Sequence, residues 1–119
     1  MAHYAWLNEN NIVINVTIGV DENITQQSVG GTSEAWETFY TNAVNQEGVY
    51  LKRTSYNANI RGKYAGVGDS YNTEEDIFIA PQPYPSWIRS GSFWNPPTPR
   101  PTEGFWYWDE TSLSWIEEI

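Results

Sequence analysis

The chain has 119 residues, about the length of one ordinary domain, and its 15 acidic and 6 basic residues give a net charge of −9. This charge argues against a protein that binds nucleic acid through clustered cations. The absence of cysteine excludes disulfides and thiolate metal ligands, and a mean hydropathy of −0.57 leaves no apolar run long enough for a membrane helix.

Charge divides the chain into three parts. Residues 1–48 carry −6, residues 49–68 carry +4 without an acid, and residues 69–119 carry −7. We expect a single domain over 1–119, built from an N-terminal hairpin with a helix, a basic strand and loop, and a series of aromatic and proline-rich hairpins. The basic strip of the middle part either neutralises the acidic flanks within the fold or forms an exposed contact for an acidic partner. It consists of Lys52, Arg53, Arg61 and Lys63.

A β-hairpin is predicted at the N-terminus. Residues 8–11 have typical turn chemistry, and residues 12–20 carry a branched apolar side chain at every second position. This period of two predicts a strand with one face toward a core. The residues expected on that face are Ile12, Ile14, Val16, Ile18 and Val20.

One short helix is predicted over residues 33–46. Glu34 and Glu37 fall in its first turn, where the helix dipole favours negative charge. Its apolar side chains recur at spacings of three and four and are expected to pack in the core: Ala35, Trp36, Phe39, Tyr40, Ala43 and Val44. A strand is predicted over residues 49–55. An ordered loop is predicted over residues 57–68, because its Gly and Asn residues tolerate left-handed backbone angles.

Three aromatic pairs in the last third share one spacing of seven residues. A hairpin with a loop of two or four residues places such a pair directly opposite each other. The pairs are Tyr71 and Phe78, Trp87 and Trp94, and Trp108 and Trp115. The predicted loops centre on Glu74-Glu75, Ser90-Gly91 and Thr111-Ser112, inside or beside polar stretches.

All seven prolines follow the first two aromatic pairs. They recur three, five and seven residues after Phe78 and again after Trp94, which indicates an internal repeat. Prolines at alternate positions remove donors from one strand edge and keep the links stiff and extended. The stretch 96–99 also fits a PxxP ligand, although rigid links are the favoured interpretation. Together these elements predict an α+β fold that is mainly antiparallel β, with one short helix and aromatic β-hairpins toward the C-terminus.

The acidic and histidine side chains do not predict an active site. Most acids, from Asp69 to Glu118, fall in predicted turns or near the C-terminus, where solvated carboxylates are the default. His3 is the only histidine, which argues against a Ser-His-acid triad. We therefore predict no catalytic residue, no metal, no cofactor and no enzymatic activity.

Aromatic rings are the remaining candidates for function. Along residues 105–108, alternation puts Trp106 and Trp108 on one face and Phe105 and Tyr107 on the other. Rings in such positions pack in a core, bury against another subunit, or stack on sugars. The candidate binding residues are Trp94, Trp106 and Trp108.

Several motifs carry a resemblance that extends over nearly the whole chain, residues 19–48 least. They are MAHYA and ENNIV at 1–5 and 9–13, TSYNANIR at 54–61, YAGVG at 64–68, FIAPQPYPSW at 78–87 and YWDE at 107–110. On these motifs the chain resembles a family of small, largely uncharacterised proteins of tailed phages that infect marine cyanobacteria and other marine bacteria.

This resemblance implies a phage origin and supplies no catalytic residues. We expect a non-enzymatic structural or interaction protein, in the virion or in the host cytoplasm, that meets copies of itself or other virion subunits through aromatic surfaces. One alternative is a glycan-binding module for a host-surface polysaccharide. Another is an intracellular modulator of a host protein, for which the negative charge favours a basic target. Neither nucleic acid nor a membrane is an expected partner.

Overall fold

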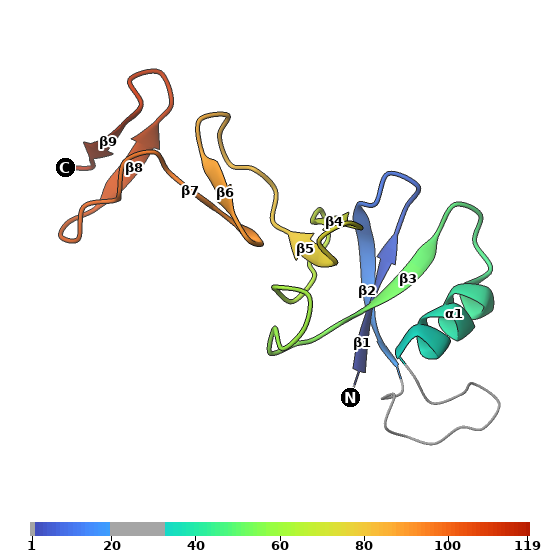
Figure 1. Cartoon of the computed structure of the whole chain (residues 1–119). Coiled ribbons are helices and arrows are strands. Elements are labelled where there is room, and N and C mark those ends of the chain that lie inside the picture. The colour runs from blue at the N-terminus through green and yellow to red at the C-terminus, as the bar shows by residue number, and fades with distance from the viewer. Residues whose placement is uncertain (1, 20–32) are drawn as a thin grey trace.

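A three-stranded antiparallel sheet organises the N-terminal half of the molecule (Figure 1). In this computed structural model, which describes residues 2–19 and 33–119, the central strand is β1 (Ala2–Leu7). Its neighbours are β2 (Val13–Gly19) and β3 (Tyr50–Thr54), and helix α1 (Ser33–Val44) packs beside β3. The predicted N-terminal hairpin, the helix and the strand near 49–55 are confirmed.

Strand β1 is buried on both faces. On one face Tyr4 packs with Trp36 of α1 and Leu51 of β3. On the other face Leu7 packs with Tyr71 and Phe78, which belong to the first of the C-terminal hairpins. The apolar side chains of β1 therefore join two core clusters, because this strand lies between a helix and a hairpin.

Strand β2 contains a bulge that changes the predicted core face. Trp6 pairs with Asn15 but Leu7 pairs with Val13, so the register skips Ile14. One extra residue reverses the facing of the side chains before it, and Val13 enters the core while Ile14 is exposed. Val16 does pack against the core, whereas Ile18 is 61% exposed. The predicted face was therefore wrong for Ile14, whereas Ile18 lies on the same face as Val16 but is not buried. Val20 lies outside the described residues.

Helix α1 ends at Val44, two residues before the predicted end at 46. Asn45 has a left-handed φ of 48°, which terminates the helix. Its N–H donates to the carbonyl of Thr41 at 3.2 Å. The predicted loop at 57–68 also contains left-handed residues, including Ala58 and Arg61, and has no strand.

Two of the three predicted aromatic hairpins are confirmed in register. The first joins β4 (Ser70–Asn72) to β5 (Ile77–Ile79), and the third joins β8 (Trp106–Asp109) to β9 (Ser114–Glu117). Each has a four-residue loop that ends in a left-handed residue, Asp76 in one and Leu113 in the other. The pairs Tyr71–Phe78 and Trp108–Trp115 lie directly opposite, with ring centroids 5.3 Å apart in both cases.

The second hairpin forms, but its predicted aromatic pair is wrong. Strands β6 (Ile88–Ser90) and β7 (Phe93–Asn95) place Arg89, and not Trp87, opposite Trp94. The two-residue loop is Gly91-Ser92, one position later than expected. Gly91 has a φ of 60° at the first loop position, where the type II′ turn requires glycine. Trp87 precedes the strand and packs against the third hairpin instead.

The second and third hairpins extend away from the sheet as an arm, residues 88–119 (Figure 1). The molecule measures 59 × 28 × 25 Å and its radius of gyration is 18.1 Å. A compact domain of this length would have a radius of gyration of about 13 to 14 Å. The described residues thus form small antiparallel sheets with one short helix, in agreement with the predicted α+β class. That residues 1–119 are a single domain stays a prediction.

Candidate functional site

The basic strip lies among acids of the same chain. The Arg61 guanidinium contacts Glu37 of α1 at 2.6 Å and Asp76 of the first hairpin at 2.7 Å. Lys52 lies 3.6 Å from Glu37, and Lys63 pairs with Asp69. Asp69 is buried, so the expectation that it is a solvated turn acid was wrong. These ion pairs tie the helix, β3 and the first hairpin together.

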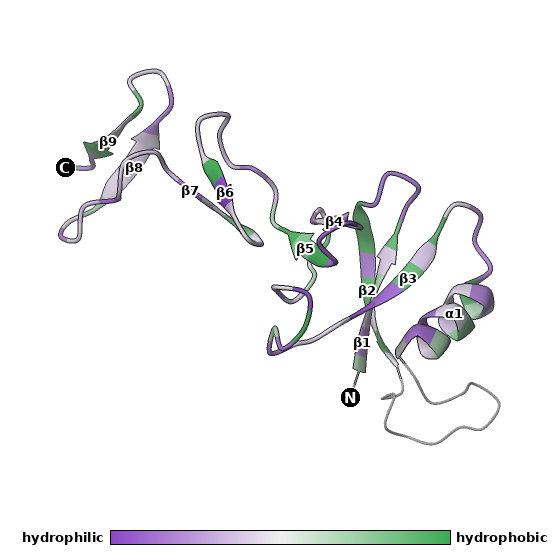
Figure 2. Ribbon diagram, in the orientation of Figure 1, coloured by the Kyte–Doolittle hydropathy of each residue, from purple (hydrophilic) through white to green (hydrophobic). Residues whose placement is uncertain are grey.

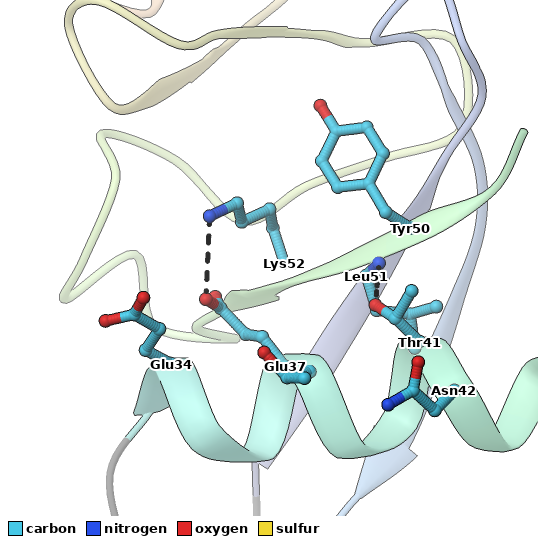
Figure 3. Close-up of a pocket in the computed structure, with 8 residues that line it drawn as sticks. Glu34, Glu37, Thr41, Asn42, Tyr50, Leu51 and Lys52 are labelled. Carbon is cyan, nitrogen blue, oxygen red and sulfur yellow. Dashed lines mark hydrogen bonds and ion pairs between the residues drawn. The ribbon is translucent and has the colours of Figure 1, made fainter.

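Helix α1 protects the outer edge of β3 (Figure 3). Thr41 Oγ1 accepts a hydrogen bond from the Leu51 N–H at 2.8 Å, and Glu37 accepts one from the Arg53 N–H at 2.6 Å. Glu37 and Thr41 are one helical turn apart, so they face alternate N–H groups of the strand. The hollow beside them measures 280 Å³, but the Glu37 carboxylate and the Thr41 hydroxyl that line it are engaged with the sheet edge. The edge of β3 is therefore closed to a further strand.

The polar cluster around Arg61 keeps its ordinary charge states near neutral pH. Burial and a hydrogen bond to Asp76 raise the pKa of Tyr71. Burial would raise the pKa of Asp76, but hydrogen bonds from Tyr71 and Arg61 outweigh it and lower that pKa. Burial would lower the pKa of Arg61, but its bonds to Glu37 and Asp76 raise it. Each pKa moves away from neutrality, which suits a structural cluster better than an acid–base pair.

Of the three tryptophans singled out from the sequence, Trp108 is the least accessible. It is 6% exposed, and its indole N–H donates to Glu110 at 2.9 Å. Trp94 and Trp106 are half-buried, and their indole N–H groups donate to the carbonyls of Ala80 and Glu103. Trp108 therefore presents no exposed ring to a partner.

The exposed large apolar side chains of the arm are different ones. Leu113, in the loop between β8 and β9, and Ile119, the last residue, are two of them. The other four lie in or beside the arm strands, and we call them the apolar arm residues: Ile88, Phe93, Phe105 and Tyr107. Alternation separated Phe105 and Tyr107 from their tryptophan neighbours, but it did not show which face is covered. Trp87 decides this, because its ring packs on the Trp108 side. Phe93 was not predicted, because the spacing of seven residues from Trp87 indicated its neighbour Trp94.

Indole N–H groups hold the two proline-rich links. Trp94 donates to the carbonyl of Ala80 at 2.7 Å, and Trp115 donates to the carbonyl of Thr98 at 2.8 Å. Both acceptors directly precede a proline, and each donor sits on the second strand of the hairpin that follows the link. Each link is therefore clamped by its next hairpin, which fixes the geometry of the arm.

Ser86 provides a second junction along the arm. Its hydroxyl and its N–H donate to the Glu110 carboxylate at 2.7 and 3.1 Å. Hydrogen bonds from Trp108 and Ser86 lower the pKa of Glu110, so the carboxylate remains ionised at neutral pH. Beside this junction is a cleft of 450 Å³, lined by Trp87, Asn95, Pro96, Pro99, Arg100 and Trp115.

The described parts of the chain contain neither a candidate metal centre nor a helix that could span a membrane. Within residues 2–19 and 33–119, no three His, Asp or Glu side chains are grouped so that they could hold a metal ion. No helix in these ranges has both the length and the apolar character needed to cross a membrane. His3 lies in β1, where its ring contacts Tyr64 with centroids 5.4 Å apart. The histidine is thus part of the packing between β1 and the loop.

Comparisons with known proteins identify no relative. No family model, no curated protein and no solved structure matches the chain. The resemblance to phage proteins therefore stays a prediction from the sequence motifs.

Proposed function

We propose that this chain is a non-enzymatic interaction protein of a tailed phage, a component or accessory of the particle, and that its arm binds another protein subunit. The observation that carries this proposal is the exposure of large apolar side chains on very small sheets. The apolar arm residues are between 52% and 76% exposed. Exposed aromatic side chains of this kind are typical of protein–protein contacts.

The architecture of the arm supports a protein partner. Both arm sheets, β6–β7 and β8–β9, have only two strands among the described residues. A two-stranded hairpin is marginally stable by itself. Figure 2 shows hydrophobic segments on β6 and β9 of the arm as well as on β5, which packs in the core. A partner subunit would cover the rings and pair with the free strand edges.

The part of the chain that precedes the arm supports a structural role. Its acids Glu37 and Asp69 are buried and paired with cations, and Asp76 is held by Arg61 and Tyr71. Carboxylates used in this way stabilise the fold. The phage assignment rests on the sequence motifs. Of these, FIAPQPYPSW covers the end of β5 and the link that leads to the arm, and YWDE lies in the third hairpin.

Mass spectrometry of purified particles tests this proposal. The chain should be present in particles of the phage that encodes it, at a constant ratio to the capsid protein after repeated purification. Phe105→Ser combined with Tyr107→Ser should lower its amount in particles by about tenfold. Ile18→Ser, which replaces an equally exposed apolar side chain on β2, should leave that amount unchanged. Detection in infected-cell lysate but not in particles would refute the proposal.

A further inference from the structure

The cleft beside Trp87 differs from the rest of the arm in its lining. Two indole rings, Trp87 and Trp115, have centroids 6.2 Å apart and are backed by Trp108. The Trp115 ring is fixed by its hydrogen bond to the Thr98 carbonyl. Asn95 is the polar uncharged side chain of the lining. Preformed apolar walls with a few polar groups are characteristic of small-molecule sites.

Arg100 brings an uncommitted positive charge to this cleft. The other cation of residues 69–119, Arg89, pairs with Glu75 at 2.6 Å. Lys52, Arg61 and Lys63 are likewise paired with acids. Arg100 is exposed and makes no ion pair or hydrogen bond with any residue that the structure describes. The cleft has no acidic lining residue, although residues 69–119 contain nine acids.

We propose that this cleft binds an acidic saccharide, that is, a pyranose residue that carries one carboxylate. The C–H face of the sugar packs on the indole rings, and the Arg100 guanidinium pairs with the carboxylate through its planar fork of donors. The Asn95 amide, which both donates and accepts, binds a hydroxyl. The rest of the arm is negative, so the expected ligand has an isolated carboxylate flanked by neutral sugars.

The state of Trp115 distinguishes this ligand from a proline-rich peptide. Recognition of a proline-rich segment uses aromatic-lined grooves, and an indole N–H that binds a peptide carbonyl must be free. The Trp115 N–H is already bonded to Thr98 of the chain's own link. The Trp87 N–H has no hydrogen-bond partner, but its nitrogen is buried. The two indoles therefore offer ring faces to a ligand, and a sugar needs no more than these. The apolar arm residues do not line this cleft, so the site is independent of the proposed protein contact.

Titration of the full-length chain with two matched disaccharides tests the proposal. One contains glucuronic acid linked to a neutral sugar, and in the other glucose replaces the glucuronic acid. Tryptophan fluorescence should show saturable binding of the acidic disaccharide and at least about tenfold weaker binding of the neutral one, because a charge-assisted hydrogen bond is lost. Equal binding of the two, or no binding of the acidic one, would overturn the proposal.

Two variants locate the site. Arg100→Gln should weaken binding of the acidic disaccharide by at least about tenfold, while Arg89→Gln, the matched change at the other arm cation, should not. Indole N–H signals in NMR spectra report on each ring separately. Those of Trp87 and Trp115 should shift on addition of the acidic disaccharide, and that of Trp36 should not. Unchanged affinity of Arg100→Gln, or shifts confined to Trp36, would contradict this site.

Discussion

Trp87, in the link before β6, meets Trp108 of β8 edge to face, with ring centroids 6.0 Å apart. Trp115 completes the cluster at 5.3 Å from Trp108. The contact joins the link before the second hairpin to the third hairpin. The Ser86–Glu110 hydrogen bonds connect the same two segments. This junction holds the two arm hairpins in one arrangement.

Removal of the Trp87 ring should uncouple the third hairpin from the second. We expect Trp87→Ala to cost about 2 kcal/mol of local stability, since the ring is half-buried and full removal of a buried Trp costs about 3–5 kcal/mol. Near-UV circular dichroism should lose the signal of coupled indoles, and amide exchange should accelerate in residues 106–117. Phe93→Ala, at an exposed ring, should leave both measurements unchanged. If the amides of residues 106–117 exchanged as slowly in Trp87→Ala as in the unchanged chain, this role of the cluster would be contradicted.

Gly62 supports the turn of the second hairpin. It has a φ of 81°, and a Cβ there would overlap Ser92 Oγ. Gly68 has a similar φ of 98°, but nothing lies within 4 Å of its Cβ position. Both alanine substitutions carry the left-handed cost of about 1–2 kcal/mol. Gly62→Ala should cost more in a denaturant titration and should also raise amide exchange in residues 88–95. Equal effects of the two substitutions would show that the contact with Ser92 is unimportant.

Glu37 should be the acid on which the N-terminal half depends most. Its removal leaves Arg61 without its buried partner and the Arg53 N–H without its acceptor. Breaking a buried pair in this way costs about 3–5 kcal/mol, which urea unfolding of Glu37→Ala would measure. Glu34→Ala, an exposed acid on the same helix, should change stability by less than about 0.5 kcal/mol. A small effect of Glu37→Ala would mean that other contacts, and not the Glu37 ion pair, stabilise this part of the molecule.

Alkaline pH should destabilise the chain partly through Tyr71. Its pKa is raised by burial and by the bond to Asp76, so the folded state favours the protonated hydroxyl. This stability is fully present below the unfolded pKa of 10.0 and is lost as pH rises through the folded pKa. Tyr71→Phe keeps a ring against Phe78 and should reduce the loss of stability above pH 10. An unchanged alkaline slope in chemical denaturation would exclude this linkage.

Local patterns were sufficient to predict the elements in this chain, and long-range contacts decided their register and exposure. The spacing of Tyr71 with Phe78 and of Trp108 with Trp115 predicted two hairpins correctly. In each, a four-residue loop lies midway between the two rings, so the strands pair with the rings directly opposite each other. The same spacing failed for Trp87 and Trp94, where the preference of Gly91 for the first turn position shifted the pairing.

Which side chains are exposed depends on packing between distant elements, and the periodicity of the sequence does not specify this packing. The bulge at Ile14 reversed the core face of β2 at its start, and no local signal marks such an insertion. Residues 105–108 alternate in a way that defines two faces, but only the distant Trp87 ring selects which of them is buried. The pairing of Asp69 with Lys63 also came from loop geometry that the charge pattern alone does not specify.

Site-specific photo-cross-linking in purified particles tests the proposed protein contact most directly. A photoreactive phenylalanine derivative placed at Phe105, which is 76% exposed on the arm, should couple the chain to one particle protein. The same derivative at Ile18 of β2 should give no such product. Absence of a cross-linked product from Phe105, or the same product from both positions, would contradict the account.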